Sequence, residues 1–382
     1  MVCVIVFAFV ACNPESAADG GDTSKSVTIT MKANEGVGDD VVLSVDANTS
    51  VALTEGSFTK EGMMFLGWNT KADYSGEPYA DCSTVTPTTD LTLYAQWVDE
   101  GTFTVDENGV LDGGPFLSGE LPQNLALPRS IGGVTVTETS ENLLYGISDD
   151  GGLLSVALPD TITTLGATTF MSCNVLETVK LPSALTTIGT SCFSSCSKLK
   201  NITIPETVIE IKHNAFSMCY ELESLTLPAS LTTMYENTFS LCPAIITLDS
   251  DNTTYVQEDG MIFDAAKTTL YYNSSTGFEI TIPENVTKIA AQAFCYSPLT
   301  IVNIPSTVTE VGDYAFYNCS NLKVVRVYAE NPPTVGYSTF TNTKLTRYND
   351  DSEGYIVVPK ASTSLYGDAE NWKCFKMYYL TE

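Results

Sequence analysis

The sequence of 382 residues predicts a mainly β protein, in which a solenoid of stacked repeats follows a small, separate β module. Two observations predict the solenoid. Proline, phenylalanine and cysteine each recur every 23 residues, and the short segments between them alternate apolar and polar residues as strands do. A third observation separates the module, because residues 26–98 alternate in the same way but lack the repeat. With 43% hydrophobic residues, the chain can build a buried core.

The first segment, residues 1–12, has the character of an export signal. Residues 1–11 are apolar or small and precede Cys12, and 11 residues are too few to span a bilayer, which takes about 20 in a helix. Phe9-Val10-Ala11-Cys12 resembles a bacterial lipobox, and this resemblance implies lipidation of Cys12. A plain cleaved signal and a buried strand are the alternatives. Residues 13–25, which are rich in small and acidic side chains, are expected to form a tether.

Residues 26–98 are expected to fold as a compact β module. The segments SVTITM, VVLSV and LTLYAQW alternate as a half-buried sheet would, so we expect Tyr94 and Trp97 in the core of the module. Residues 62–68 (GMMFLGW) and 91–97 (LTLYAQW) resemble the Listeria–Bacteroides repeat. That resemblance implies a β-grasp-like fold and an extracellular spacer or contact module without catalysis.

The repeats occupy residues 159–345, after an amino-terminal cap and a first irregular repeat at 101–158. In the unit that contains Pro205, the apolar residues of the frame are predicted to point inward, and Asn201 and Thr203 outward. The inward residues are Leu199, Ile202, Ile204, Val208 and Ile211. One unit cannot bury this face alone, so neighbouring units should stack about 4.8 Å apart and form a parallel sheet.

This frame is similar to that of leucine-rich repeats. The 23-residue form, with Ile-Pro, Ala-Phe and Cys in register, resembles the BspA-like subfamily of bacterial surface proteins. The resemblance implies that residues 243–281 are an insertion, in which 260–263 and 270–272 form a β-hairpin. It also implies that residues 346–382 close the solenoid as a carboxy-terminal cap, since the open end of a solenoid needs protection.

The 11 cysteines and the charge limit the function classes. Cysteines at equivalent positions of stacked repeats point into one core, so we expect buried thiols that pack as small hydrophobes, not disulfides or metal ligands. The chain has 18 basic and 46 acidic residues, a net charge of −28. This excess argues against nucleic acid as a partner, and against membrane binding other than through a lipid anchor.

No motif points to catalysis, a cofactor or a metal. Phosphate-binding loops, dinucleotide fingerprints and the nucleophile elbow are absent from the sequence. His213, the only histidine, is expected to be solvent-exposed on the convex edge. Residues 249–252 (DSDN) begin like a calcium loop, but Thr254 stands where an EF-hand has glycine, so a solvated loop is expected.

Recognition is the function that remains. We expect a concave sheet whose outward side chains, mostly short hydroxyls, form hydrogen bonds to a protein or a glycan. This candidate ligand surface comprises Thr178, Lys180, Asn201, Thr203, Ser224, Thr226, Glu279, Thr281, Asn303 and Arg326. Because it lacks large aromatic anchors, a second candidate is a site on the insertion or the convex edge, with Tyr271, Tyr272, Tyr314 and Tyr317.

The family resemblance implies an exported protein of the outer bacterial surface, anchored by lipid, that adheres to host matrix or to cell-surface macromolecules. A scaffolding lipoprotein of the cell envelope is the alternative. A secreted hydrolase is the third option, and it would have to use His213 or a carboxylate pair.

Overall fold

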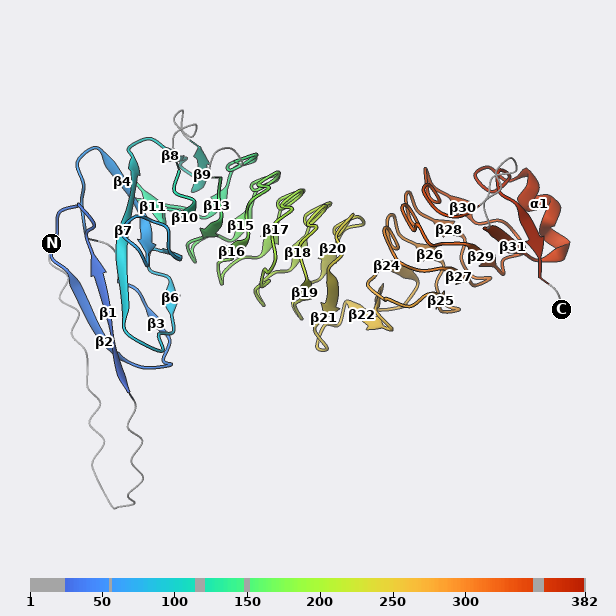
Figure 1. Cartoon of the computed structure of the whole chain (residues 1–382), viewed down its shortest axis with the longest axis horizontal. Helices are drawn as coiled ribbons and strands as arrows, with labels where there is room; N and C mark the ends of the chain where they lie inside the picture. The colour runs from blue at the N-terminus through green and yellow to red at the C-terminus, as the bar shows by residue number, and fades with distance from the viewer. Residues whose placement is uncertain (1–24, 55–56, 114–120, 148–151, 346–353, 381–382) are drawn as a thin grey trace, which may run out of the picture.

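A computed structural model describes residues 25–54, 57–113, 121–147, 152–345 and 354–380. Figure 1 shows the module at the blue end, a row of stacked turns next to it, and a cap with helix α1 at the red end. The strand-rich architecture confirms the predicted fold class. In the described chain, the helices are η1 (Lys360–Ser362) and α1 (Thr363–Asp368), both in that cap.

The module is a five-stranded sheet in the order β2-β1-β7-β4-β5. Its strands are β1 (Ser26–Lys32), β2 (Val41–Asp46), β4 (Met63–Asn69), β5 (Pro78–Ala80) and β7 (Leu91–Asp99), and β3 (Val51–Ala52) pairs with β6 (Thr84–Val85) beside it. Strands β1 and β7 are parallel. Trp97 is buried as predicted, whereas Tyr94 is only half-buried; Phe58 and Trp68 complete the aromatic core instead.

The solenoid is built from two sets of strands, which we call sheet A and sheet B. Sheet A contains the strands of the Leu-x-x-Ile-x-Ile frame, and sheet B the short strands that follow each proline. Sheet A consists of β10 (Asn124–Ala126), β14 (Ser155–Ala157), β16 (Thr178–Lys180), β19 (Ser224–Leu227), β21 (Ile245–Leu248), β25 (Glu279–Thr281), β27 (Ile301–Ile304), β29 (Val324–Val327), β31 (Tyr355–Val358) and β32 (Met377–Tyr379). Between β16 and β19, Asn201 forms an isolated parallel bridge to Thr178.

Sheet B is interrupted once, at the predicted insertion. Its first part is β8 (Phe103–Val105), β9 (Val110–Gly113), β13 (Glu138–Thr139), β15 (Thr164–Leu165), β17 (Thr187–Ile188), β18 (Glu210–Ile211) and β20 (Thr233–Met234). Its second part is β22 (Tyr255–Glu258), β23 (Met261–Asp264), β24 (Thr269–Asn273), β26 (Lys288–Ile289), β28 (Glu310–Val311) and β30 (Thr334–Val335). A separate hairpin joins β11 (Ser130–Ile131) to β12 (Val134–Thr135) near the start.

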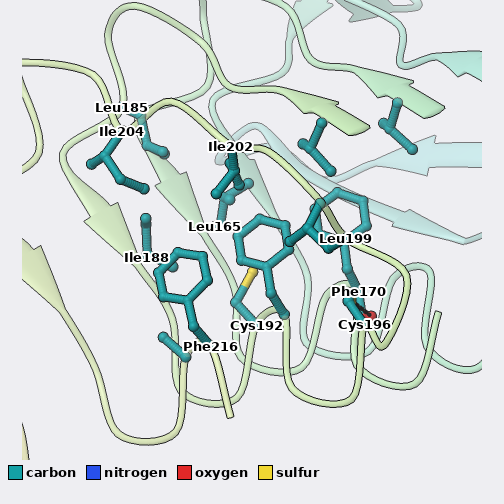
Figure 2. Close-up of a cluster of buried hydrophobic side chains, with 14 of the residues drawn as sticks. Leu165, Phe170, Leu185, Ile188, Cys192, Cys196, Leu199, Ile202, Ile204 and Phe216 are labelled. Carbon is teal, nitrogen blue, oxygen red and sulfur yellow. Dashed lines mark hydrogen bonds between the residues drawn. The ribbon is translucent and has the colours of Figure 1, made fainter. Parts of the chain in front are cut away.

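The third side of the solenoid consists of the turns that carry the repeated phenylalanines. Phe170, Phe193 and Phe216 stack with ring centroids 5.2 and 5.4 Å apart, and Phe294 and Phe316 repeat this at 4.9 Å. Figure 2 shows Phe170 and Phe216 of the first block among leucines and isoleucines from both sheets. All five frame residues of the Pro205 unit are buried, as predicted. Stacking of identical positions therefore forms the core.

The interruption divides the core into two blocks. Strands β22, β23 and β24 form an antiparallel meander, which includes the predicted hairpin, and β24 then pairs in parallel with β26. Residues 245–248 still pair in parallel with β19, so the repeat continues beyond the expected insertion start at 243. The buried residues form two apolar clusters, and the boundary between them falls within β23: Ile262 belongs to the first cluster and Met261 to the second. In Figure 1 the two blocks meet at an angle beside β22 and β24.

Candidate functional site

The outward side of sheet A carries the ten residues of the predicted ligand surface. Seven of the ten are exposed, while Lys180 and Arg326 are half-buried and Asn303 is buried. The exposed seven are Thr178, Asn201, Thr203, Ser224, Thr226, Glu279 and Thr281. Alternation along each strand produces this face, because the residues between them point into the core. The three covered residues have specific partners.

Lys180, a residue of the predicted ligand surface, is engaged by the module. Its Nζ lies 2.6 Å from Glu77 Oε1 and 3.5 Å from the ring centroid of Tyr79, and it donates to the carbonyl of Pro78 at 3.2 Å. Burial alone would raise the pKa of Glu77, but the hydrogen bond and charge of Lys180 outweigh it and lower that pKa. Lys180 therefore fastens the module to sheet A.

A cleft of about 700 Å³ lies between the module and the first strands of sheet A. Tyr79 and Ser83 line it from the module, and Lys180, Asn201 and Thr203 line it from the solenoid. The Oγ of Ser83 is buried and accepts or donates no hydrogen bond within the described chain. The module thus forms one wall of the surface that the sequence assigns to ligand binding.

Asn303 is buried because it is the centre of a polar network on sheet A. Its Nδ2 donates to Glu279 Oε1 at 3.1 Å and to Thr281 Oγ1 at 3.0 Å. Arg326 Nη1 donates to Asn303 Oδ1 at 3.1 Å and to Glu279 Oε1 at 3.0 Å. The hydrogen bonds from Asn303 and Arg326 lower the pKa of Glu279. Asn303 therefore holds its neighbours in place, instead of facing solvent as predicted.

Sheet A also presents apolar and aromatic side chains that the sequence analysis missed. Ile245 is 54% exposed and Tyr378 45% exposed. Tyr355 and Tyr378 meet edge to face with centroids 4.9 Å apart. Strand pairing brings Tyr355 beside Val324, and Val357 beside Arg326 and Tyr378. The expectation that this face lacks aromatic anchors was therefore wrong. The signal was in the register, because Tyr355 occupies the same outward position of its strand as Val324.

The four candidate tyrosines divide into two pairs. The hydroxyl of Tyr272 donates to the carbonyls of Cys242 and Ala244 at 3.1 and 3.3 Å, and its ring packs on Phe239. Tyr271 packs edge to face on Tyr255. Tyr272 thus has a structural role at the interruption.

Tyr314 and Tyr317 lie on the turn side of the second block. Their ring centroids are 5.5 Å apart. Tyr317 lies 6.4 Å from Tyr296, and Tyr314 lies 5.6 Å from Tyr337. This second pair is therefore part of an aromatic surface.

The remaining candidates are His213 and the calcium-like segment at residues 249–252. His213 is exposed, as predicted; its ring centroid lies 4.5 Å from that of Tyr235, and Nδ1 is 3.3 Å from the carbonyl oxygen of Glu236. In the calcium-like segment, Asn252 is buried, and its side chain bonds to backbone groups of Pro228, Leu231, Thr254 and Tyr255. It therefore acts as a structural bridge. Among the residues that the structure covers, no three His, Cys, Asp or Glu gather as a metal site.

The cysteines of the described repeats are free thiols. Six of the seven repeat cysteines are buried, as the sequence predicts: Cys173, Cys192, Cys196, Cys219, Cys242 and Cys319; Cys295 is only half-buried. The predicted export signal and the predicted lipobox, with Cys12, lie outside the described residues. Over the described ranges, no helix combines the length and apolar character needed to cross a membrane.

Two protein families match this chain, one over the module and one over the solenoid. Residues 27–96 match the Listeria-Bacteroides repeat domain. Residues 148–263 and 265–357 match the BspA type leucine rich repeat region in six copies. Among curated proteins, none matches the chain.

Several solved structures are similar to this chain. The pneumococcal vaccine antigen PcpA has 17% identity and a TM-score of 0.47, over 74% of this chain and 99% of that chain. A leucine-rich repeat protein from Bacteroides ovatus has 20% identity and a TM-score of 0.45, over 68% and 70%. A leucine rich cell surface protein from Faecalibacterium prausnitzii has 19% identity and a TM-score of 0.41, over 73% and 93%.

The repeat match spans more than half of the chain and coincides with the two stacked blocks of the solenoid. The chain therefore belongs to the BspA-type leucine-rich-repeat family, with a Listeria–Bacteroides repeat domain in front of its repeats.

Proposed function

We propose that the chain is an exported, lipid-anchored protein of the bacterial surface, which adheres to host or neighbouring cells by holding a protein ligand on sheet A. The proposal rests on a cluster of polar and aromatic side chains toward the carboxy-terminal end of that sheet. We define the anchor cluster as Glu279, Asn303, Arg326, Tyr355 and Tyr378. It combines an ordered cation with two aromatic rings on one outward face.

The anchor cluster has the chemistry of a binding hot spot. Arginine and tyrosine are enriched where interfaces concentrate their binding energy, since both offer large contact areas and directional hydrogen bonds. Arg326 is already fixed by Glu279 and Asn303, so little side-chain entropy is lost when a partner binds. The hydroxyl residues of the preceding strands then suit the polar rim of an interface.

A binding screen with the full chain tests the proposal. Immobilised matrix proteins, mucin and intact cells are probed with the wild type, Arg326→Gln and Tyr378→Ala. We expect each substitution to weaken binding about tenfold or more. Tyr145→Ala is the matched control, because Tyr145 is 52% exposed and lies away from sheet A's carboxy-terminal end. Absence of binding to every surface, or equal binding by all variants, contradicts the adhesive role.

Cellular location is tested separately. Protease treatment of intact cells should remove the solenoid from wild-type cells, and Cys12→Ala should release the protein from the membrane fraction. Protection from protease on intact cells would instead favour the scaffolding role inside the envelope.

A further inference from the structure

A second concave site lies away from sheet A, on the turn side where the two blocks meet. It is a groove of about 430 Å³ that continues from the turns of the first block to those of the second. The first block contributes Ser194, Ser217 and Ser240 among its lining residues, and the second contributes Gln292, Tyr314 and Tyr317. These are equivalent positions of successive repeats, so the groove runs along the stacking direction.

Three serines with available hydroxyls form a row in the groove. Ser194, Ser217 and Ser240 each follow a core phenylalanine, and their residues are 7%, 5% and 7% exposed. Their backbone carbonyls accept hydrogen bonds from the preceding turns. Their side-chain hydroxyls, by contrast, form no hydrogen bond within the described chain, and they are not among its fully buried polar atoms, so they are open to solvent in the groove. Nearly buried hydroxyls without a protein partner are suited to a polar ligand.

Gln292 adds an unsatisfied acceptor on the opposite block. Its Oε1 is buried and has no hydrogen-bond partner among the described residues. An unpaired buried amide oxygen is unfavourable. Because Gln292 lines the groove, a rotation of its side chain would present this oxygen to a ligand hydroxyl, which is a suitable donor. Gln292 and the serine row therefore call for the same kind of partner, one that carries several hydroxyl groups.

Tyr314 and Tyr317 supply the aromatic wall of the groove. Their rings meet edge to face at 79°, so their two ring planes face different directions. The face of a tyrosine ring packs well against an apolar surface while its hydroxyl remains available for hydrogen bonds. A sugar ring has the matching chemistry, with C–H groups on its faces and hydroxyls around its rim.

The groove also lacks charge. None of its lining residues is Asp, Glu, Lys, Arg or His, although the chain carries a net charge of −28. An anionic ligand would meet no cation here and would be repelled by the surrounding acidic protein. We propose that this groove binds a neutral oligosaccharide, whose rings lie along the repeats with one end stacked on Tyr314 and Tyr317.

Calorimetric titration of the full chain tests this proposal. The probes are neutral hexasaccharides of glucose and of mannose, together with hyaluronan hexasaccharide as the anionic comparison. We expect a neutral hexasaccharide to bind and the anionic one not to bind. Tyr317→Ala should weaken binding about tenfold, Tyr317→Phe much less, and Ser217→Ala severalfold. Tyr220→Ala is the matched control, because Tyr220 is 51% exposed and does not line the groove.

The outcomes separate this site from the anchor cluster. Arg326→Gln should leave sugar binding unchanged, so the two proposals succeed or fail independently. Circular dichroism confirms that each variant folds, and Ser217→Ala is the mildest change should Tyr317→Ala destabilise the chain. The proposal is overturned if no neutral sugar binds up to about 10 mM. It is equally overturned if the anionic sugar binds better, or if Tyr317→Ala and Ser217→Ala both bind like the wild type.

Discussion

The repeated cysteines are explained by one contact that recurs along the solenoid. The thiols of Cys196 and Cys219 donate to the carbonyls of Phe170 and Phe193 at 3.1 and 3.2 Å, and Cys319 donates to Phe294 at 2.9 Å. In each case the acceptor lies one repeat earlier. Cysteine is both small enough for this interior position and able to donate a weak hydrogen bond, which alanine and valine cannot do.

These buried thiols should be unreactive in the folded protein. Burial raises the pKa of Cys173 and of Cys319 to about 12, so almost no thiolate exists at neutral pH. Among Cys374 and the repeat cysteines, we expect iodoacetamide at pH 8 to modify Cys374 first, because it is only half-buried and because burial raises the pKa of the half-buried repeat thiol, Cys295, to about 12. The repeat cysteines should react only after denaturation, as peptide mass spectrometry would detect. Fast labelling of Cys196 or Cys219 in the native state would contradict the buried ladder.

The environment of a residue could be predicted from the sequence where its contacts repeat from one unit to the next. Phe193 stacks on its equivalent in the next repeat, and Cys196 donates to Phe170 in the preceding one, so the 23-residue period alone places both in the core. Lys180 pairs instead with Glu77, which belongs to another domain. Asn303 is covered by Glu279 and Arg326 from different repeats. Alternation shows that a side chain points outward, but it does not show what then lies over it.

At the scale of elements, the interruption is bridged by a few specific contacts. Tyr272 from β24 closes the open end of the first block by packing on Phe239 and bonding to two carbonyls. Glu236 of the first block accepts from the Lys288 ammonium at 2.8 Å and from the Ala291 amide at 3.1 Å. The meander thus replaces the contacts that a regular repeat would make.

The hydroxyl of Tyr272 should contribute measurably to stability. Tyr272→Phe leaves the carbonyls of Cys242 and Ala244 without this donor, and we expect the free energy of unfolding to fall by about 1–3 kcal/mol. Tyr271→Phe is the control, because the contact of Tyr271 with Tyr255 is between rings and survives the change. Urea denaturation followed by circular dichroism measures both. Equal stability of the two variants would argue against a bridging role for Tyr272.

The elements also show where sequence patterns lose their precision. The hairpin could be predicted because residues 261–263 and 270–272 are short apolar runs on either side of a polar turn. The start of the insertion could not be predicted from the sequence. Residues 245–248 have the alternation of a repeat strand, but no proline follows them. The structure shows that pairing with β19 is sufficient to keep them in sheet A.

At the scale of the whole molecule, the module and the solenoid share one apolar core. Leu66 and Val98 of the module belong to the same buried cluster as the first repeats. The Gln96 side chain donates to the Asn124 carbonyl at 2.6 Å and accepts from the Ala126 amide at 2.9 Å, as a neighbouring strand would. The module therefore closes the amino-terminal end of the solenoid, a role beyond the spacer or contact module that the sequence implied.

This arrangement predicts that docking of the module depends on pH through Glu77. Its pKa is lowered from 4.5 in the folded protein, where the interaction with Lys180 outweighs the effect of burial. A carboxylate with a depressed pKa stabilises the fold above its unfolded pKa, and that contribution is lost as pH falls through the folded value. Acidification below about 4.5 should therefore loosen the module from Lys180.

Melting temperatures of the wild type and Glu77→Gln test this expectation between pH 7 and pH 3. Tryptophan fluorescence is a suitable signal, because Trp68 and Trp97 are buried in the module. The variant should melt below the wild type at pH 7, and the difference should vanish as Glu77 becomes protonated. Glu35→Gln is the control, since Glu35 pairs with Lys60 inside the module and its side chain is 82% exposed. A difference that persists unchanged at pH 3 would show that Glu77 acts through packing, not through its charge.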